Sequence, residues 1–359
     1  DAARLPVPTE PVLKPASAYT LIGRPLPAKN LPAIVHAQAV YGLDVRVPGM
    51  LYAVIERAPT VNGRLAAVHD ADARAVPGVV AVVPLRGNRF PTAELYLRDG
   101  VAVVARSTWA ALQGRKRLRV DWHAQPADGR GGNGALASSA ALDEDFARAL
   151  DGRETPPPAA VQPAVTVHRV GTEDGMRDAF TRAAHRLTLE YGLPLQAHAP
   201  MEPVNAVAHW QGDRCELWAG THFQTRLMNE ARAVTGLPAE RIVIHTPMLG
   251  GSFGRRLEPD YAIEALRLSR EIGKPVQVLW TREDDLQHGL FAPPSRHRVR
   301  VAVDGGGRLL ALDHAFATLS VRRQTDPAAQ PAQAADPAAS IDAVKFPYAV
   351  DTMHVRYHL

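Results

Sequence analysis

The feature that most constrains the fold is a change of composition that divides the 359-residue chain. From His123 to Pro163 the sequence is dominated by Gly, Ala, Ser and Pro, which is typical of a connector and not of a packed core. Because both flanking regions mix strand-like and helix-like patterns, we expect two packed units of the α/β (α+β) class. The predicted divisions are a Pro-rich extended arm at 1–35, an α/β domain at 36–123, a linker at 124–167 and a second domain at 168–359.

Apolar periodicity and helix punctuation predict the elements of both domains. In the first domain we expect strands at 51–55, 79–83, 101–104 and 118–122, and helices at 70–75 and 107–114, the latter capped by Ser107. In the second we expect helices at 224–235, ended by Gly236, and at 259–272, ended by Gly273. Further strands are expected at 187–191, 206–210, 216–219, 241–245 and 276–280, a helical pattern from Met176, a short helix at 142–150, and a loop at 324–340.

Composition excludes several functional classes. The 41 basic against 37 acidic side chains leave a net charge of only +4, so we expect no nucleic-acid partner. No apolar stretch is long enough for a transmembrane helix. The single cysteine, Cys215, excludes an internal disulfide, a cysteine-based zinc site and an iron–sulfur cluster, and its strand-like surroundings predict a buried, unreactive thiol.

Two short motifs suggest other chemistries on spacing alone. Gly129-x-Gly131-x-x-Gly134, with Asp151 further on, has the spacing of a dinucleotide-binding turn, but Pro126 and its neighbours separate it from the preceding strand. A flexible linker is therefore the favoured interpretation of that motif.

The second motif, at 250–254, matches the G-x-S-x-G nucleophile elbow of hydrolases. Ser252 would be the nucleophile, with Asp284 or Asp285 and His288 or His314 as partners. Residues 255–258 intervene before Pro259 can open a helix, so the elbow geometry is not expected. A serine acyl hydrolase stays the alternative function.

The same glycines offer a third interpretation, a backbone cradle for a phosphate or a cofactor ring. Its residues are Gly250, Gly251, Ser252, Phe253 and Gly254, with Arg255 and Arg256 adding charge. The alternative is a tight strand-to-helix connection followed by two surface arginines. Upstream, the segment 196–203 is bounded by proline and rich in polar groups; a lone His198 within it is more often structural than a ligand.

Taken in order, several motifs resemble the large molybdenum-cofactor subunit of the xanthine oxidase family, most closely its isoquinoline 1-oxidoreductase and aldehyde dehydrogenase branch. The resemblance covers most of the chain. It rests on the following segments: 41–45 with 48–53, 73–79, 100–105, His198-Ala199-Pro200-Met201-Glu202-Pro203, 250–256, and Trp280-Thr281-Arg282-Glu283-Asp284-Asp285. It implies a hammerhead-type α/β domain followed by the first molybdenum-cofactor-binding domain.

The resemblance also implies a function. The enzyme would oxidise an aldehyde or an N-heteroaromatic substrate with water as the oxygen source, using molybdopterin, in its cytosine dinucleotide form, with molybdenum. The loop at 250–254 and Arg255 would bind the cofactor, Phe253 would lie near the metal, and Gln196 would lie beside the metal's apical oxygen. No residue is expected to ligate the metal directly.

Two departures from the family pattern bear on partners. Ser252 occupies a position that is more often Gly. The chain ends at Leu359, before the family's catalytic Glu, so no catalytic base is assigned, and carboxylates such as Glu202, Glu258 and Glu283 do not match it.

The resemblance implies these partners: the C-terminal half of the large subunit, a small iron–sulfur subunit that carries the clusters, and a cytochrome c. A non-catalytic assembly subunit is the further alternative. A periplasmic location follows from the branch, with the cytoplasm as alternative.

Overall fold

The computed structural model describes residues 5–7, 9–60, 63–87, 97–123, 139–151, 164–321 and 336–358. Contacts divide the chain into two compact units, one up to Val40 and one from Tyr41 onward. The first contains a 3-10 turn, η2 (Ala16–Ala18), and the short helix α1 (Leu31–Val35), and its described residues are almost all exposed. The arm expected at 1–35 falls inside this unit, which extends to Val40.

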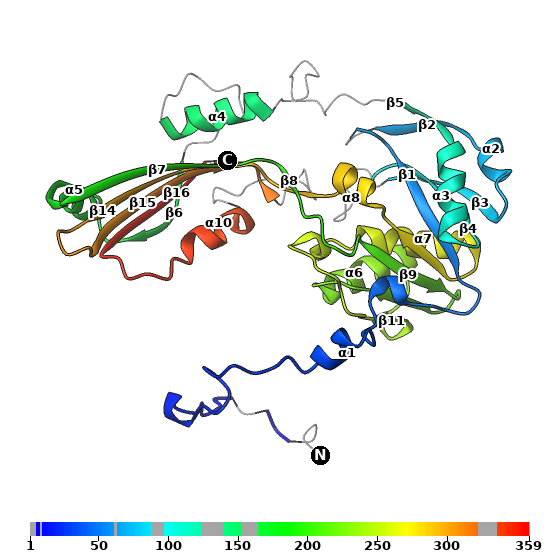
Figure 1. The fold of residues 1–359 in the computed structure, drawn as a ribbon, viewed down its shortest axis with the longest axis horizontal. Helices are drawn as coiled ribbons and strands as arrows, with labels where there is room; N and C mark the ends of the chain where they lie inside the picture. The colour runs from blue at the N-terminus through cyan, green and yellow to red at the C-terminus, as the bar shows by residue number, and fades with distance from the viewer. Residues whose placement is uncertain are drawn as a thin grey trace. The chain divides into compact units, whose positions relative to one another are not determined.

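The larger unit is built around a mixed seven-stranded sheet with the order β11-β10-β9-β12-β1-β4-β3 (Figure 1). Three strands come from the first predicted domain: β1 (Leu51–Arg57), β3 (Val79–Leu85) and β4 (Gly100–Ala105). Four come from the second: β9 (Asn205–Trp210), β10 (Cys215–Ala219), β11 (Ile242–His245) and β12 (Val276–Leu279). The two sets join where β1 runs parallel to β12, with Leu51 opposite Val276. The predicted boundary at 124–167 therefore does not separate two sheets.

Helices cover this sheet as the sequence signals predict. Helix α7 (Asp260–Ile272) packs on β9 and β12 and buries most of its first three turns. It ends at Gly273 and α6 (Gln224–Thr235) ends at Gly236, both left-handed glycines, which confirms the expected helix ends. Helix α3 (Thr108–Arg117) begins at Ser107, whose hydroxyl accepts from the Ala110 N–H, as predicted. The short α2 (Ala71–Arg74) and the pair β2 (Arg64–His69) and β5 (Arg119–His123) complete this region.

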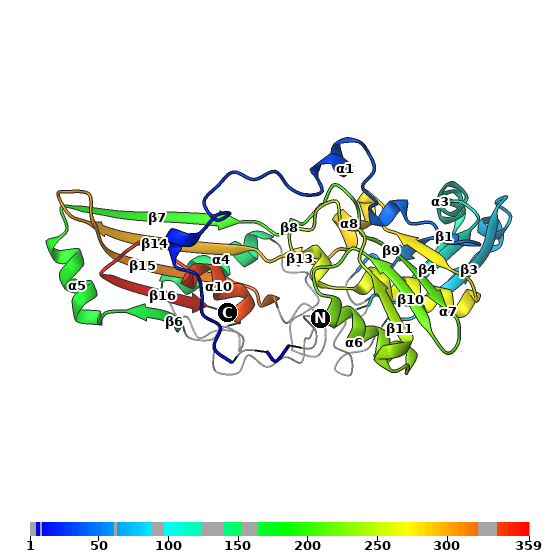
Figure 2. The same ribbon diagram turned by 90° about the horizontal axis from the view of Figure 1, so that it is seen from below.

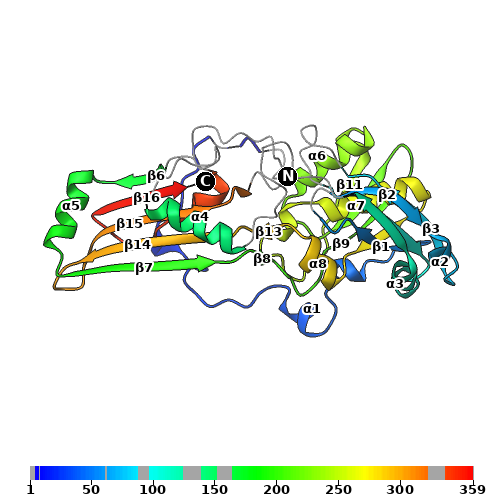
Figure 3. The same ribbon diagram turned by 90° about the horizontal axis from the view of Figure 1, so that it is seen from above.

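A second, five-stranded sheet has the order β6-β16-β15-β14-β7 (Figure 2). Its strands are β6 (Val165–Val170), β7 (His185–Leu193), β14 (Ser295–Val303), β15 (Leu309–Thr318) and β16 (Thr352–His358). Helix α4 (Ser139–Asp151) lies across β14 and β15, and α5 (Glu173–Arg182) closes one end (Figure 3). Helix α10 (Pro337–Val344) contacts β16 and β6.

Two expectations need correction here. Residues 165–167, assigned to the linker, already belong to β6, and residues 337–340, assigned to a loop, begin α10. Residues 283–285 lie in the helix α8 (Arg282–His288), which begins there because Thr281 and Asp284 form a reciprocal capping box. The apolar cores of the two sheets are separate clusters.

Candidate functional site

The glycine-rich loop follows β11 and precedes α7. After Gly254 the chain makes one 3-10 turn, η5 (Arg255–Leu257), and α7 begins only at Asp260. The nearest upstream anchor is a parallel bridge between Met248 and Tyr41, just before the turn η3 (Gly42–Asp44). As expected, no α-helix starts directly after Ser252.

The backbone of this loop is unusual. Gly251, Phe253 and Gly254 have φ of 97°, 53° and 99°, so a phenylalanine occupies the left-handed region that favours glycine. The N–H groups of residues 251–254 donate to no acceptor within the described ranges of the chain. Four consecutive donors are thus available to a ligand.

Glu202 links this loop to the rest of the sheet. Its Oε2 accepts from the Gly250 N–H at 2.8 Å, and its own N–H donates to the Gly250 carbonyl at 3.1 Å. Its Oε1 accepts from the Leu43 N–H and from Asn205 Nδ2, both at 3.0 Å. A Cβ on Gly250 would lie 2.5 Å from Glu202 Cβ, so only glycine allows this approach. The carboxylate is fully engaged, which makes a proton-accepting role for Glu202 unfavourable.

Both arginines after the loop are buried, which corrects the interpretation of two surface arginines. Arg256 donates to Glu202 Oε2 and to the Gly251 carbonyl, each at 2.9 Å. Arg255 forms a two-pronged pair with Asp260 at 2.8 and 2.7 Å. Because the guanidinium of Arg255 is 0% exposed, it is not open to a ligand.

The segment 196–203 lies against this loop. Gln196 is exposed in β8 (Gln196–Ala197), which pairs with β13 (Phe291–Ala292). His198 Nδ1 lies 2.9 Å from the Leu290 carbonyl, so Nδ1 carries the proton, and Nε2 lies 3.5 Å from where a Cβ on Gly254 would be. Burial lowers the pKa of His198, which favours the neutral ring. Ala199 has a φ of 42°, so non-glycine residues adopt the left-handed region on both sides of the site.

Two apolar side chains at the site point to solvent. Phe253 is 75% exposed and Met201 is 93% exposed. Pro200, next to Met201, lies 3.5 Å from the Cβ position of Gly251. Exposed large apolar groups beside free N–H donors are typical of a surface that a ligand or partner covers.

The hydrolase alternative is wrong. Ser252 is buried, and its Oγ accepts from the Arg256 N–H at 3.0 Å; within the described part of the chain it bonds to no histidine. The proposed partners are engaged elsewhere: Asp284 with Arg115, Asp285 with Arg282, His288 near Arg98, and His314 with His297. Ser252 is a structural residue of the loop.

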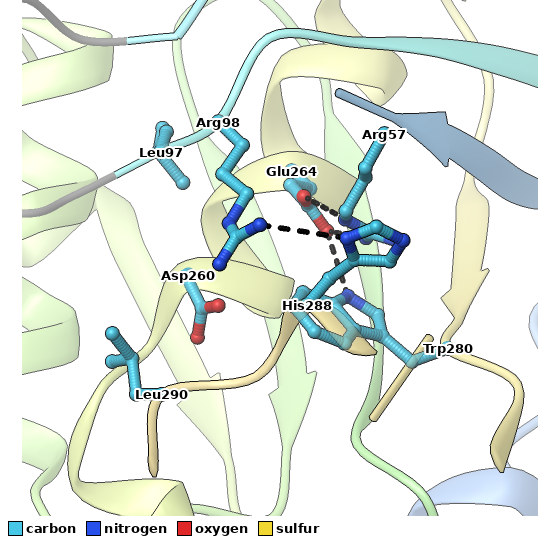
Figure 4. Close-up of a pocket in the computed structure, with 8 residues that line it drawn as sticks. All are labelled: Arg57, Leu97, Arg98, Asp260, Glu264, Trp280, His288 and Leu290. Atoms are coloured by element: carbon cyan, nitrogen blue, oxygen red, sulfur yellow. Dashed lines mark hydrogen bonds and ion pairs between the residues drawn. The ribbon is translucent and has the colours of Figure 1, made fainter. Parts of the chain in front are cut away.

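A small cavity is lined by Asp260 and Glu264 of α7 together with Arg57, Leu97, Arg98, Trp280, His288 and Leu290 (Figure 4). Arg57 pairs with Glu264 at 2.6 Å and stacks on Trp280, whose Nε1 donates to the same carboxylate. Burial, reinforced by Arg98, lowers the pKa of His288 to about 4. The cavity has a volume of about 10 Å³, which is room for roughly one water. It is therefore part of the packing and not a substrate pocket.

Of the remaining candidates, residues 129–134 lie outside the described part of the chain. Asp151, the acidic residue paired with that motif, forms an ion pair with Arg298 at 2.7 Å. Cys215 is fully buried, and burial raises its pKa to about 11, which confirms the predicted unreactive thiol.

Glu258 is a partly buried carboxyl that follows the turn η5. Burial raises its pKa to about 7, and Arg226 holds it at 2.8 Å. The sequence did not reveal the burial of Arg256 or the role of Glu202, since these two partners lie 54 residues apart along the chain. The one sequence feature that pointed to Glu202 was the density of polar groups between Gln196 and Pro203.

The loop fits a cofactor with polar edges. Glycines permit close backbone approach, and the donors at 251–254 match phosphate or pterin acceptors. Among the described residues, no three His, Cys, Asp or Glu side chains cluster as a metal site. None of the described helices combines the length and apolar character needed to cross a membrane.

Fold and loop together define a cofactor-binding protein of one family. Residues 160–358 match the molybdopterin cofactor-binding domain, and the chain belongs to that family. This confirms the resemblance to molybdenum-binding subunits of the xanthine oxidase family and the expected fold class.

Two relatives of known name are similar to most of this chain. The chain is 37% identical over 308 residues to isoquinoline 1-oxidoreductase subunit beta of Brevundimonas diminuta, covering 85% of this chain and 36% of that protein. It is 31% identical over 317 residues to a membrane-bound aldehyde dehydrogenase (pyrroloquinoline-quinone) of Gluconacetobacter polyoxogenes, covering 88% of this chain and 37% of that protein. The chain thus spans little more than a third of the length of these two relatives.

Solved structures share the fold at low identity. The carbon monoxide dehydrogenase of Oligotropha carboxidovorans superposes with a TM-score of 0.63 at 18% identity, covering 94% of this chain and 44% of that one. The aldehyde oxidoreductase of Desulfovibrio gigas gives the same TM-score and identity, covering 92% and 38%.

Proposed function

We propose that this chain holds the molybdenum cofactor in a molybdenum hydroxylase that oxidises an aldehyde or an N-heteroaromatic compound, with water as the oxygen source. The observation that carries the proposal is the run of four N–H groups at 251–254 without an acceptor in the described residues. The names of the two relatives, an isoquinoline oxidoreductase and an aldehyde dehydrogenase, support the two substrate classes.

The chain's own residues would bind and orient the cofactor. The N–H groups at 251–254 would hold its polar edge, Gly251 and Gly254 would let the backbone approach, and Gln196 and Phe253 would border its reactive side. Exposed Phe253 and Met201 would exclude water once covered. When bound, molybdopterin with molybdenum supplies two-electron oxidation of the substrate.

We also propose that the remaining parts of the reaction come from partners. The chain has one cysteine, whereas an iron–sulfur cluster needs about four thiolates, which supports clusters on a small partner subunit. The C-terminal half of the large subunit would bring the general base, because Glu202 and Glu258 are held by arginines. A cytochrome c as electron acceptor, the cytosine dinucleotide form of the cofactor and a periplasmic location complete the proposal.

The test is metal and pterin analysis of the purified assembly that contains this chain. We expect about one molybdenum and one pterin per chain. Their absence would refute the proposal and favour a non-catalytic assembly subunit. A screen of aldehydes and N-heteroaromatics with an artificial electron acceptor then decides the substrate class. Turnover by this chain alone, reconstituted with cofactor and acceptor, would refute the external base.

A further inference from the structure

We propose that Glu202 is a positioning residue for the cofactor: its carboxylate, between Gly250 and Arg256, sets the direction of the N–H groups at 251–254. This inference rests on the proposed function. It adds a role for a residue whose carboxylate is buried and bonded on both oxygens.

The backbones of Gly250 and Glu202 approach each other closely. The Gly250 N–H and carbonyl both bond to Glu202, one to its carboxylate and one to its N–H. These two bonds of opposite direction hold the two consecutive peptide groups that flank Gly250, and the second of them carries the Gly251 N–H. The four free donors follow immediately in the chain, so their orientation depends on where Gly250 is held.

An anchor lies on the other side of the carboxylate. Glu202 Oε1 accepts from Leu43 and from Asn205, which stands at the start of β9. The Leu43 N–H and the Asn205 side chain both lie beside the seven-stranded sheet, which has a buried apolar core. The loop at 250–254 is thus fixed to the seven-stranded sheet, a rigid element, and not to another loop.

Arg256 closes the loop. Its guanidinium donates to Glu202 Oε2 and to the Gly251 carbonyl, so the residues before and after the free donors are tied to one carboxylate. The side chains are 0% and 8% exposed. A buried ion pair gains little net stability over well-packed apolar groups, because both charges lose their hydration. Its benefit is the fixed geometry of the loop.

The experiment compares Glu202→Gln with Glu264→Gln in the complete assembly. Glu264 is a matched control, since it is also a buried carboxylate paired with an arginine, Arg57, but it contacts none of residues 250–254. The Glu202 carboxylate accepts from four groups, two at each oxygen. A glutamine at 202 keeps one acceptor oxygen and turns an NH₂ toward the two groups that donate to the other oxygen. We expect pterin affinity to fall about 10- to 100-fold in Glu202→Gln and to change less than about threefold in Glu264→Gln.

Hydrogen exchange gives a second readout that does not involve turnover. The Gly250 amide should exchange at least about tenfold faster in Glu202→Gln than in Glu264→Gln, at equal loss of melting temperature. Equal pterin affinity and equal exchange in the two variants would overturn the inference.

If Glu202→Gln does not fold, Arg256→Lys supplies the test. Lysine keeps the positive charge beside Glu202 but loses the hydrogen bond from Arg256 Nε to the Gly251 carbonyl. We therefore expect the same faster exchange of the Gly250 amide and the same weaker pterin binding. Wild-type affinity in that variant would overturn the inference. Failure of the wild-type assembly to bind pterin would instead refute the proposed function, so the two failures are distinguishable.

Discussion

Two groups of arginine–carboxylate pairs occupy opposite environments, one around the seven-stranded sheet and one on β14 of the five-stranded sheet. Around the seven-stranded sheet, the arginines of Arg255–Asp260, Arg256–Glu202 and Arg57–Glu264 are 0 to 2% exposed. On β14 of the five-stranded sheet, Arg296 pairs with Glu190 and Arg298 with Asp151, and all four side chains are 25 to 39% exposed. Buried charges are costly unless every partner is in place, whereas exposed pairs contribute little. The first region therefore specifies geometry, and the second tolerates change.

Removing one member of a buried pair should have the largest effect. We expect Arg256→Ala to lower the free energy of unfolding by about 3–5 kcal/mol, because it leaves the Glu202 charge buried without its partner. Arg298→Ala should lower it by less than about 1 kcal/mol. Denaturant unfolding of both variants checks this, and similar losses would remove the distinction between the two regions.

Alanine substitutions of glycine should have opposite signs in the two regions. Gly250→Ala places a Cβ 2.5 Å from Glu202 Cβ and should cost about 1–3 kcal/mol, since neither backbone can move freely. Gly192→Ala in β7 has nothing within 4 Å and should be neutral or stabilise by about 0.5 kcal/mol. Thermal melting decides; a harmless Gly250→Ala would show that the loop can relax away from Glu202.

Acid should weaken both regions through a neutral histidine. Burial, reinforced by His297, lowers the pKa of His314 to about 4, as burial does for His288 around the other sheet. The unfolded chain takes up these protons first, so the contribution of the two histidines to the free energy of unfolding should decrease as pH falls from about 6.5 to 4 and then level off. We expect His314→Gln and His288→Gln each to reduce that decrease by about 1–2 kcal/mol, after allowance for partial solvent exposure. Denaturant unfolding at several pH values measures it, and an unchanged slope in both variants would contradict the assignment.

Phe253→Ala should have the smallest effect on stability. The ring is 75% exposed, so its removal should change the free energy of unfolding by less than about 0.5 kcal/mol. Turnover of the assembly should nevertheless fall, because we place the ring at the cofactor. Melting and activity per folded molecule are the measurements; a large loss of stability at unchanged activity would count against the site.

The sequence predicts what local chemistry determines. Gly236, Gly273 and Ser107 end or begin helices through their own backbone or hydroxyl, and each was placed correctly. The alternation in β14 was a usable signal for a strand, yet the strand was not assigned. At the site, glycine spacing identified the loop at 250–254, and the structure gives it free donors.

What the sequence does not predict depends on contacts between distant residues. No local pattern states that Arg256 pairs with Glu202, so two adjacent arginines looked like surface residues. The same holds for the sheet, in which strands of both predicted domains are neighbours. The composition changes at 124–167, but a change of composition is not a break in packing.

The pairing of β1 with β12 has a consequence for synthesis on the ribosome. Leu51 lies opposite Val276, about 225 residues later in the chain. At about 5–20 residues per second, the ribosome needs roughly 10–45 s between the two strands. β1 can pair with β4 early, yet its other edge stays open until β12 emerges. During that interval the nascent chain presents an unpaired strand, which is where a chaperone or a mispaired neighbour would bind first.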